Sequence, residues 1–153
     1  IITMDGDGTH DPKYLNKISN NSDKYDFVLT NRFLVKNSLK NWPLLRIILT
    51  HASHLLLKNL LGLKHDTSGA FRLINTNKVK LKDLLLANDN DYAYFWKSIF
   101  YLKKKKYNIG EIPIILPARV AGKSKMNLWH IIRGVLSLFM FFLLNIFKKN
   151  HYI

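Results

Sequence analysis

The chain has 153 residues, 48% of them hydrophobic, which is enough to bury one ordinary core and gives no reason to expect two domains. It contains no cysteine, so disulfides, thiolate zinc sites and cysteine nucleophiles are excluded. Lys and Arg number 24 against 10 Asp and Glu, and the net charge of +14 predicts attraction to a polyanion: nucleic acid, an anionic membrane surface or a phosphorylated substrate.

Strand-like apolar runs alternate with helical patterns along the chain. The expected strands are residues 1–4, 25–31, 68–74 and 109–116, and the expected helices are residues 12–19, 43–61 and 92–105. This alternation predicts an α/β fold. The first strand leads directly into an acidic cluster, with no initiator Met or polar leader before it, so we expect the chain to begin within a domain.

Residues 127–153 differ in composition from residues 1–126. Residues 134–147 are apolar except for Ser137 and Asn145, and cations flank them on both sides. The stretch falls short of the ~18 to 20 apolar residues that a spanning helix needs. We therefore expect a helix that lies in a membrane interface or docks on a membrane partner helix, with a buried core helix as the alternative.

The segment MDGDGTHDP places Asp5 and Asp7 directly after the first expected strand, where ligands of open α/β sheets bind. Two carboxylates there suit Mg²⁺ or Mn²⁺, which completes its shell with water and substrate phosphates. A diphosphate-bearing substrate follows from this interpretation. His10 could support such a metal loop or simply cap the turn. The alternative is a pair of acids in a Gly-rich turn.

The letters DGDGT also match the opening motif of haloacid-dehalogenase-like phosphatases, in which the first Asp is a nucleophile and the second a general acid. That interpretation needs a hydroxyl after a second strand, which Thr30 could supply, and an acidic pair after a later strand. Asp89 and Asp91 follow LKDLLLA, which is more typical of a helix end than of a strand. The metal site is therefore favoured over the phosphatase.

Further motifs occur in a fixed order along the chain. They are MDGDGTHDPKYL, the segment Thr30 to Phe33, the pair Trp42 and Arg46, DTSGAFRL at residues 66–73, and GEIPI followed by Arg119, Gly122, Ser124 and Lys125. Together they resemble the dolichol-phosphate mannosyltransferase family, within the family 2 glycosyltransferases, and they cover nearly the whole chain. DTSGAFRL is the most specific of these matches.

The resemblance implies an α/β, Rossmann-like GT-A glycosyltransferase fold that lacks its N-terminal part, with residues 1–126 as the C-terminal part of the catalytic domain. It implies that Asp5 and Asp7 bind the metal. The catalytic residues that it implies are Asp7, Arg119 and Lys125, and the substrate-binding residues are Asp5, Arg32, Arg46, Asp66, Arg72 and Ser124. A guanidinium group can donate to two phosphate oxygens at once, and a Lys supplies a point charge, so the Arg and Lys residues suit phosphate ligands.

The function that the resemblance implies is transfer of a sugar, expected to be mannose, from a nucleotide-diphosphate sugar such as GDP-mannose to a polyprenyl (dolichyl-type) phosphate. The enzyme would be membrane-associated, with its active site facing the cytoplasm. The alternative is a non-catalytic basic module that holds lipid or nucleic acid. Scattered Lys with no aromatic platform and no nucleic-acid motif argue against a nucleic-acid partner.

The chain departs from the family pattern at three places. Gly6 and Gly8 flank the second Asp, Thr9 stands where the family often has Gln or Ser, and Lys97 falls where it usually has Glu. A Lys in place of Glu near the acceptor side would be expected to alter sugar or lipid choice, or to mark a divergent relative.

Overall fold

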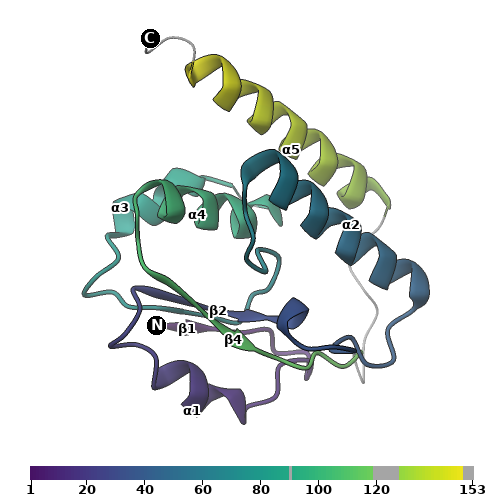
Figure 1. Cartoon of the computed structure of the whole chain (residues 1–153), viewed down its shortest axis with the longest axis vertical. Helices are drawn as coiled ribbons and strands as arrows, with labels where there is room; N and C mark the ends of the chain where they lie inside the picture. Colours follow the sequence, from purple (N-terminus) through teal and green to yellow (C-terminus); the bar gives the residue numbers. More distant parts are fainter. Residues whose placement is uncertain (90, 119–127, 150–153) are drawn as a thin grey trace.

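The computed structural model describes residues 1–89, 91–118 and 128–149, and in them one four-stranded sheet has helices on both faces (Figure 1). The strands are β1 (Ile2–Thr3), β2 (Phe27–Asn31), β3 (Arg72–Ile74) and β4 (Ile109–Pro113), in the spatial order β1-β3-β2-β4. β2 pairs in parallel with β4, whereas β3 pairs antiparallel with β1 and β2. The mixed α/β architecture predicted from the sequence is confirmed.

The helices are unequal in length and lie on opposite faces of the sheet. The helices are α1 (Tyr14–Ser19), α2 (Leu44–Leu61), α3 (Leu81–Leu84), α4 (Ala93–Lys104) and α5 (Leu128–Lys149), with short 3-10 helices η1 (Arg32–Leu34) and η2 (Leu85–Ala87). α1 lies on one face and α3 and α4 on the other, while α2 and α5 lie side by side on the α4 side (Figure 1). α2 ends where Gly62 adopts a left-handed conformation, with φ +66°.

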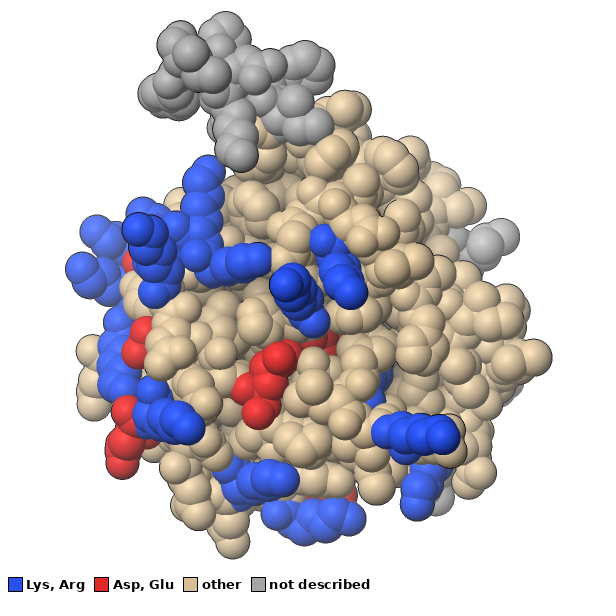
Figure 2. All heavy atoms as spheres, viewed as in Figure 1, with Lys and Arg blue, Asp and Glu red and all other residues tan. Residues whose placement is uncertain are grey.

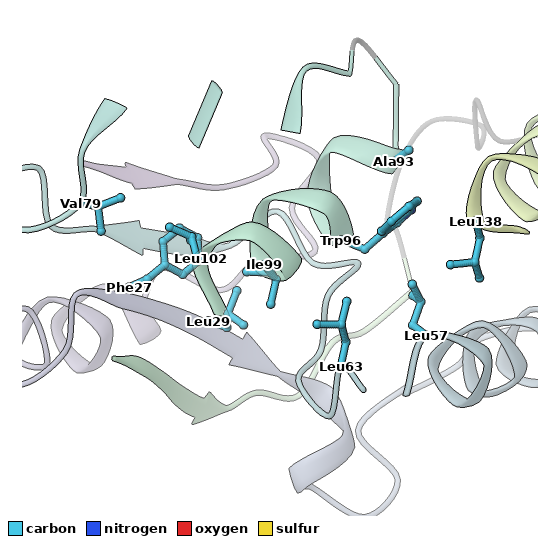
Figure 3. Packing of buried hydrophobic residues seen from close by; sticks show 10 residues of the cluster. All are labelled: Phe27, Leu29, Leu57, Leu63, Val79, Ala93, Trp96, Ile99, Leu102 and Leu138. Atoms are coloured by element: carbon cyan, nitrogen blue, oxygen red, sulfur yellow. The ribbon is translucent and has the colours of Figure 1, made fainter. Parts of the chain in front are cut away.

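β2 is the centre of the core because all five of its residues are buried. Successive side chains of a strand point to opposite faces. Phe27 and Leu29 therefore pack against Ile99 and Leu102 of α4 (Figure 3), whereas Val28 belongs to the cluster on the α1 face. Burial of each such large apolar side chain contributes roughly 1.5 to 3 kcal/mol, so this strand fixes the positions of the helices on both faces.

α2 and α5 bury few of their side chains. Leu57 is the buried residue of α2, and Leu138 is buried among the α5 side chains that the structure describes. Both residues meet Trp96 of α4 in the core cluster (Figure 3). Within the described residues, no helix combines the length and the apolarity needed to cross a membrane.

The helices expected at 12–19, 43–61 and 92–105 are confirmed, with ends that differ by one or two residues. β3 is shorter than the expected 68–74: the backbone N of Ser68 and the carbonyl of Gly69 bond to the side chains of Asp66 and Arg72. β4 ends at Pro113 rather than at residue 116, consistent with the lack of a backbone N–H in proline. The sequence did not predict α3 as a separate helix.

Gly110 in β4 provides a test of this packing, because a Cβ there would lie 2.4 Å from Cδ2 of Tyr25. We expect Gly110→Ala to lower the free energy of unfolding by roughly 1 to 3 kcal/mol through overpacking. Urea denaturation of the two proteins would measure the change. Gly6→Ala is the control, since nothing lies within 4 Å of a Cβ at that position. Equal unfolding midpoints for Gly110→Ala and the parent protein would contradict the packing described.

Candidate functional site

The sheet topology brings the sequence motifs to one edge. β1, β2 and β4 run in the same direction, so their carboxyl ends share that edge, and the antiparallel β3 begins there. Asp5 and Asp7 follow β1, Arg32 follows β2, and the segment from Asp66 to Ala70 leads into β3. Ligands of open α/β sheets bind outside the carboxyl ends of the strands. The acidic turn and the arginine are therefore neighbours because of the fold.

A cavity of about 460 Å³ opens at this edge, between the sheet and helices α2, α4 and α5. Its polar lining includes Asp5, Asp7, Thr9, His10, Arg32, Arg46 and Ser68, and its apolar lining includes Leu49, Leu56, Leu57, Phe95, Trp96, Ile131, Val135 and Leu138. Both carboxylates come from the acidic turn at the sheet edge, and most of the apolar groups come from the three helices. The cavity therefore suits a ligand with a charged part and an apolar part.

The acidic turn is held by its own hydrogen bonds. Thr9 donates from its backbone N and from Oγ1 to Oδ1 of Asp7, at 3.1 and 2.6 Å. Gly8 has φ +75°, which few residues other than glycine adopt without strain, so this departure from the family pattern suits the tight turn. Thr9, the other departure in the turn, orients the carboxylate of Asp7.

His10 lies under this turn with 5% of its surface exposed and packs against Phe71. Its Nδ1 accepts a hydrogen bond of 2.9 Å from the backbone N of Asp5. Burial lowers the pKa of His10 below its ordinary value, and this effect outweighs the opposing charges of Asp5 and Asp7. The ring is therefore neutral at pH 7 and carries its proton on Nε2, so that Nδ1 supports the turn.

The acidic turn fits a divalent cation that keeps part of its shell for other ligands. Among the described residues, no group of three or more His, Cys, Asp or Glu could hold a metal. Asp5 and Asp7 line one cavity and offer hard carboxylate oxygens. Mg²⁺ is commonly held by one or two carboxylates together with waters and substrate phosphates. A metal here would depend on the substrate for some of its ligands.

Arg32 and Asp66 form a buried ion pair beside the acidic turn. The Nε of Arg32 lies 2.6 Å from Oδ2 of Asp66, and the backbone N of Arg32 donates to the same oxygen at 3.2 Å. The other carboxylate oxygen, Oδ1, accepts bonds from the backbone N and Oγ of Ser68. Asp66 is 1% exposed, and Arg32 is among the cavity residues whereas Asp66 is not.

Arg72 lies in the core, 3% exposed, with its guanidinium stacked near Phe95. It donates to the carbonyl oxygens of Gly69 and Thr67 and to Oγ of Ser98 on α4. Burial lowers the pKa of Arg72 to about 10, against the opposing effect of Asp66, so it remains charged at pH 7. The structure does not bring Arg72 to the cavity surface with Arg32 and Arg46.

Arg46, in the first turn of α2, stacks on the indole ring of Trp42, with its guanidinium carbon 4.0 Å from the ring centroid. Both residues line the cavity. The indole Nε1 of Trp42 is buried without a hydrogen-bond partner among the described residues. The spacing of four residues noted in the sequence thus places a cation on an aromatic face at the cavity wall.

Lys97 pairs with Asp89, at 2.6 Å between Nζ and Oδ2, and lies near the rings of Trp96 and Phe141. Burial alone would raise the pKa of Asp89, but the hydrogen bonds from Lys97 and from the backbone N of Asp91, together with the charges of Lys97 and Arg133, hold the pKa below its ordinary value. Oδ2 of Asp91 lies 3.8 Å from Nε of Arg133 on α5. These two pairs connect the turn before α4 with α4 itself and with α5.

The geometry does not support the phosphatase interpretation. Asp89 and Asp91 follow the 3-10 helix η2 and not a strand, and neither lines the cavity that contains Asp5 and Asp7. The hydroxyl of Thr30 is buried and donates to the carbonyl of Phe71. The residues that this interpretation requires do not meet in one place.

Three residues named from the sequence, Arg119, Ser124 and Lys125, lie outside the described residues. Sequence reasoning did not single out Ser98, or Tyr92 and His130, whose rings are 6.0 Å apart and line the cavity. A Ser among the buried positions of α4 was the available signal for Ser98. Tyr92 and His130 gave no local signal, because α4 and α5 meet only in the tertiary structure.

Lys and Arg are spread over the face seen in Figure 2, with few acidic residues between them. The upper right of that view, where α2 and α5 lie in Figure 1, is largely free of them.

Comparison with known proteins finds similarity to enzymes of the glycosyltransferase class. A polyprenol monophosphomannose synthase from Mycolicibacterium smegmatis is 26% identical over 133 residues, covering 83% of this chain and 49% of the relative. An undecaprenyl-phosphate mannosyltransferase from Micrococcus luteus is 27% identical over 128 residues, covering 83% and 53%. The chain is thus similar to polyprenyl-phosphate mannosyltransferases, which confirms the resemblance seen in its motifs.

The chain spans about half the length of the curated relatives that it matches. No known protein-family profile matches it.

Proposed function

We propose that the protein transfers mannose from a nucleotide-diphosphate sugar, GDP-mannose, to a polyprenyl (dolichyl-type) phosphate. The observation that carries the proposal is the single cavity that is lined by two carboxylates, by two arginines and by many apolar side chains of three helices. The names of the two relatives describe synthesis of a polyprenol monophosphomannose and mannose transfer involving undecaprenyl phosphate in those proteins. We also propose that the sheet is the C-terminal part of a GT-A catalytic domain.

The charges at the polar end suit a metal diphosphate. Asp5 and Asp7 would hold Mg²⁺ or Mn²⁺, which supplies positive charge beside the departing diphosphate. Arg32 and Arg46 offer guanidinium groups to phosphate oxygens. The metal offsets the two carboxylates, so the two arginines remain to attract the anionic phosphates of donor and acceptor.

The transfer itself needs alignment more than proton removal. A phosphomonoester is largely dianionic at pH 7 because its second pKa is about 6, so its oxygen can attack the anomeric carbon without a general base. The new bond joins that oxygen to the sugar, and the electron pair of the broken bond leaves with the nucleoside diphosphate. The neutral, buried His10 agrees with this scheme, since its Nδ1 is engaged with the backbone of Asp5.

The apolar end of the cavity suits the first isoprene units of the acceptor. Leu56 and Leu57 of α2 face Val135 and Leu138 of α5 across it. Gly134 lies on the same face of α5, and a Cβ there would meet nothing within 4 Å. The lack of a side chain at Gly134 therefore leaves space between the two helices.

We propose further that α2 and α5 dock the enzyme on a cytoplasmic membrane face. Both helices expose large apolar side chains, among them Leu44, Leu45, Ile48, Trp129, Leu136 and Met140, each more than half exposed. Exposed apolar surface of this extent marks a membrane or protein interface. The net charge of +14 favours an anionic bilayer, and the polar end of the cavity would then lie near the headgroups.

The first test is the metal requirement of the full-length protein. We expect mannose transfer from GDP-mannose to a polyprenyl phosphate to need Mg²⁺ or Mn²⁺, and Asp7→Ala to abolish it while the circular dichroism spectrum stays unchanged. Undiminished transfer in excess chelator would refute the metal role. Hydrolysis of simple phosphate esters that is lost in Asp5→Asn would instead favour the phosphatase.

The second test concerns the apolar end of the cavity. Gly134→Leu should fill the space between α2 and α5 and raise the KM for a long polyprenyl phosphate roughly ten-fold, the effect of about 1.4 kcal/mol. A short, water-soluble acceptor should be little affected. The helix itself should tolerate the change, because Leu has a higher helix propensity than Gly. Leu136→Phe, which adds bulk outside the cavity, is the control. Equal losses on both acceptors would contradict this role.

The third test concerns membrane docking. Replacing Leu136 and Met140 of α5 by Ser should weaken co-sedimentation with anionic liposomes at least ten-fold, since each buried side chain contributes on the order of 1 kcal/mol or more. The matched control replaces Leu81 and Leu85, which are equally exposed on α3 and η2, by Ser. Similar liposome binding by both variants would show that α5 does not form the docking surface.

A further inference from the structure

We propose that Asp66 and Arg72 are positioning residues that present Arg32 to the phosphate groups, and that neither binds substrate itself. This inference rests on the proposed function and deepens it. It assigns Asp66 and Arg72 of the DTSGAFRL motif to positioning, and Arg32 to contact with the ligand. It revises the roles that the resemblance implies for these two residues.

The carboxylate of Asp66 has no capacity left for a ligand. An ionised carboxylate accepts about four hydrogen bonds. Oδ2 accepts from the backbone N and Nε of Arg32, and Oδ1 accepts from the backbone N and Oγ of Ser68. With 1% of its surface exposed, Asp66 is enclosed by these donors and does not line the cavity.

Arg72 is also committed to protein groups. Its Nε, Nη1 and Nη2 donate to Gly69, Ser98 and Thr67, at 2.6, 3.0 and 2.8 Å. Two of these acceptors are carbonyl oxygens of the segment that contains Ser68, and the third belongs to α4. Arg72 therefore ties the segment 67–69 to α4, and Asp66 holds Ser68 of the same segment through two further hydrogen bonds.

Arg32 is the residue that this arrangement leaves available. Its pair with Asp66 uses Nε, and no hydrogen bond among the described residues uses Nη1 or Nη2. A Cβ on Gly69 would lie 3.4 Å from Nη2, so glycine at that position leaves the group uncovered. Held through Nε, the guanidinium keeps a fixed direction with its two Nη groups open to a phosphate.

A double-mutant cycle in the full-length protein separates positioning from direct binding. The variants are Asp66→Asn, Arg32→Gln and the double variant, and the measurements are kcat, the KM for each substrate, and the Kd of Mg²⁺-pyrophosphate by calorimetry. Asp66→Asn alone should weaken pyrophosphate binding about ten-fold, and Arg32→Gln ten- to a hundred-fold. If Asp66 acts through Arg32, the double variant should bind no more weakly than Arg32→Gln.

If the fold-increases in the pyrophosphate Kd of the two single variants multiply in the double variant, Asp66 contacts the ligand independently of Arg32, and the proposal is overturned. Asp83→Asn is the matched control, because Asp83 is also buried and accepts a bond of 2.7 Å from Tyr107 remote from the cavity. It should lower the melting temperature without changing the pyrophosphate Kd. If Asp66→Asn fails to fold, Ser68→Ala removes one donor to Oδ1 and should give a smaller loss that also disappears in the Arg32→Gln background.

Failure of the proposed function gives a different result from failure of this inference. Absence of mannose transfer by the unmodified enzyme would refute the function, while the pyrophosphate cycle would still report on Asp66 and Arg32. Mannose transfer by the unmodified enzyme, together with fold-increases in the pyrophosphate Kd that multiply in the double variant, would refute the inference alone.

Discussion

The ion pair between Arg32 and Asp66 is the interaction on which the arrangement of the site depends. It joins the end of β2 to the segment that leads into β3, across a sequence separation of 34 residues. A buried pair adds little net stability because desolvation offsets the attraction, but removing one partner costs about 3 to 5 kcal/mol. Its effect is therefore to exclude other arrangements of the two segments. The cavity wall at this edge keeps its shape because both charges must stay together.

The sequence was sufficient to predict most of the strands and helices and the edge of the sheet at which the motifs meet. The apolar patterns predicted the four strands and three of the helices, and strand direction then explains why Asp5, Asp7 and Arg32 converge. It was not sufficient for the division of roles within DTSGAFRL. The family resemblance implies that Asp66 and Arg72 bind substrate, whereas both side chains are buried and their hydrogen bonds are directed at protein groups. Direction of that kind depends on packing against α4, which no local pattern contains.

The two long helices connect this polar edge to the apolar part of the molecule. Leu57 and Leu138 anchor α2 and α5 to Trp96, so each helix has one face in the core or cavity and another face exposed. A helix that served only to close the core would not require so many large apolar side chains on its outer face. The same two helices thus form a wall of the cavity and carry most of the exposed large apolar side chains among the described residues. A membrane or protein that covers their outer faces would therefore also lie next to the cavity.

Lys97 is a departure from the pattern of the family that the chain resembles, and it lies away from the groups at the cavity. Introducing a cation where the family has an acid would leave an unpaired charge in a partly buried place, which is costly. Here Asp89 supplies the opposite charge at 2.6 Å, and the aromatic rings of Trp96 and Phe141 flank the ammonium group. Neither Lys97 nor Asp89 is among the described residues that line the cavity. The departure therefore concerns the contact between α4 and the turn before it, and not the groups that line the cavity.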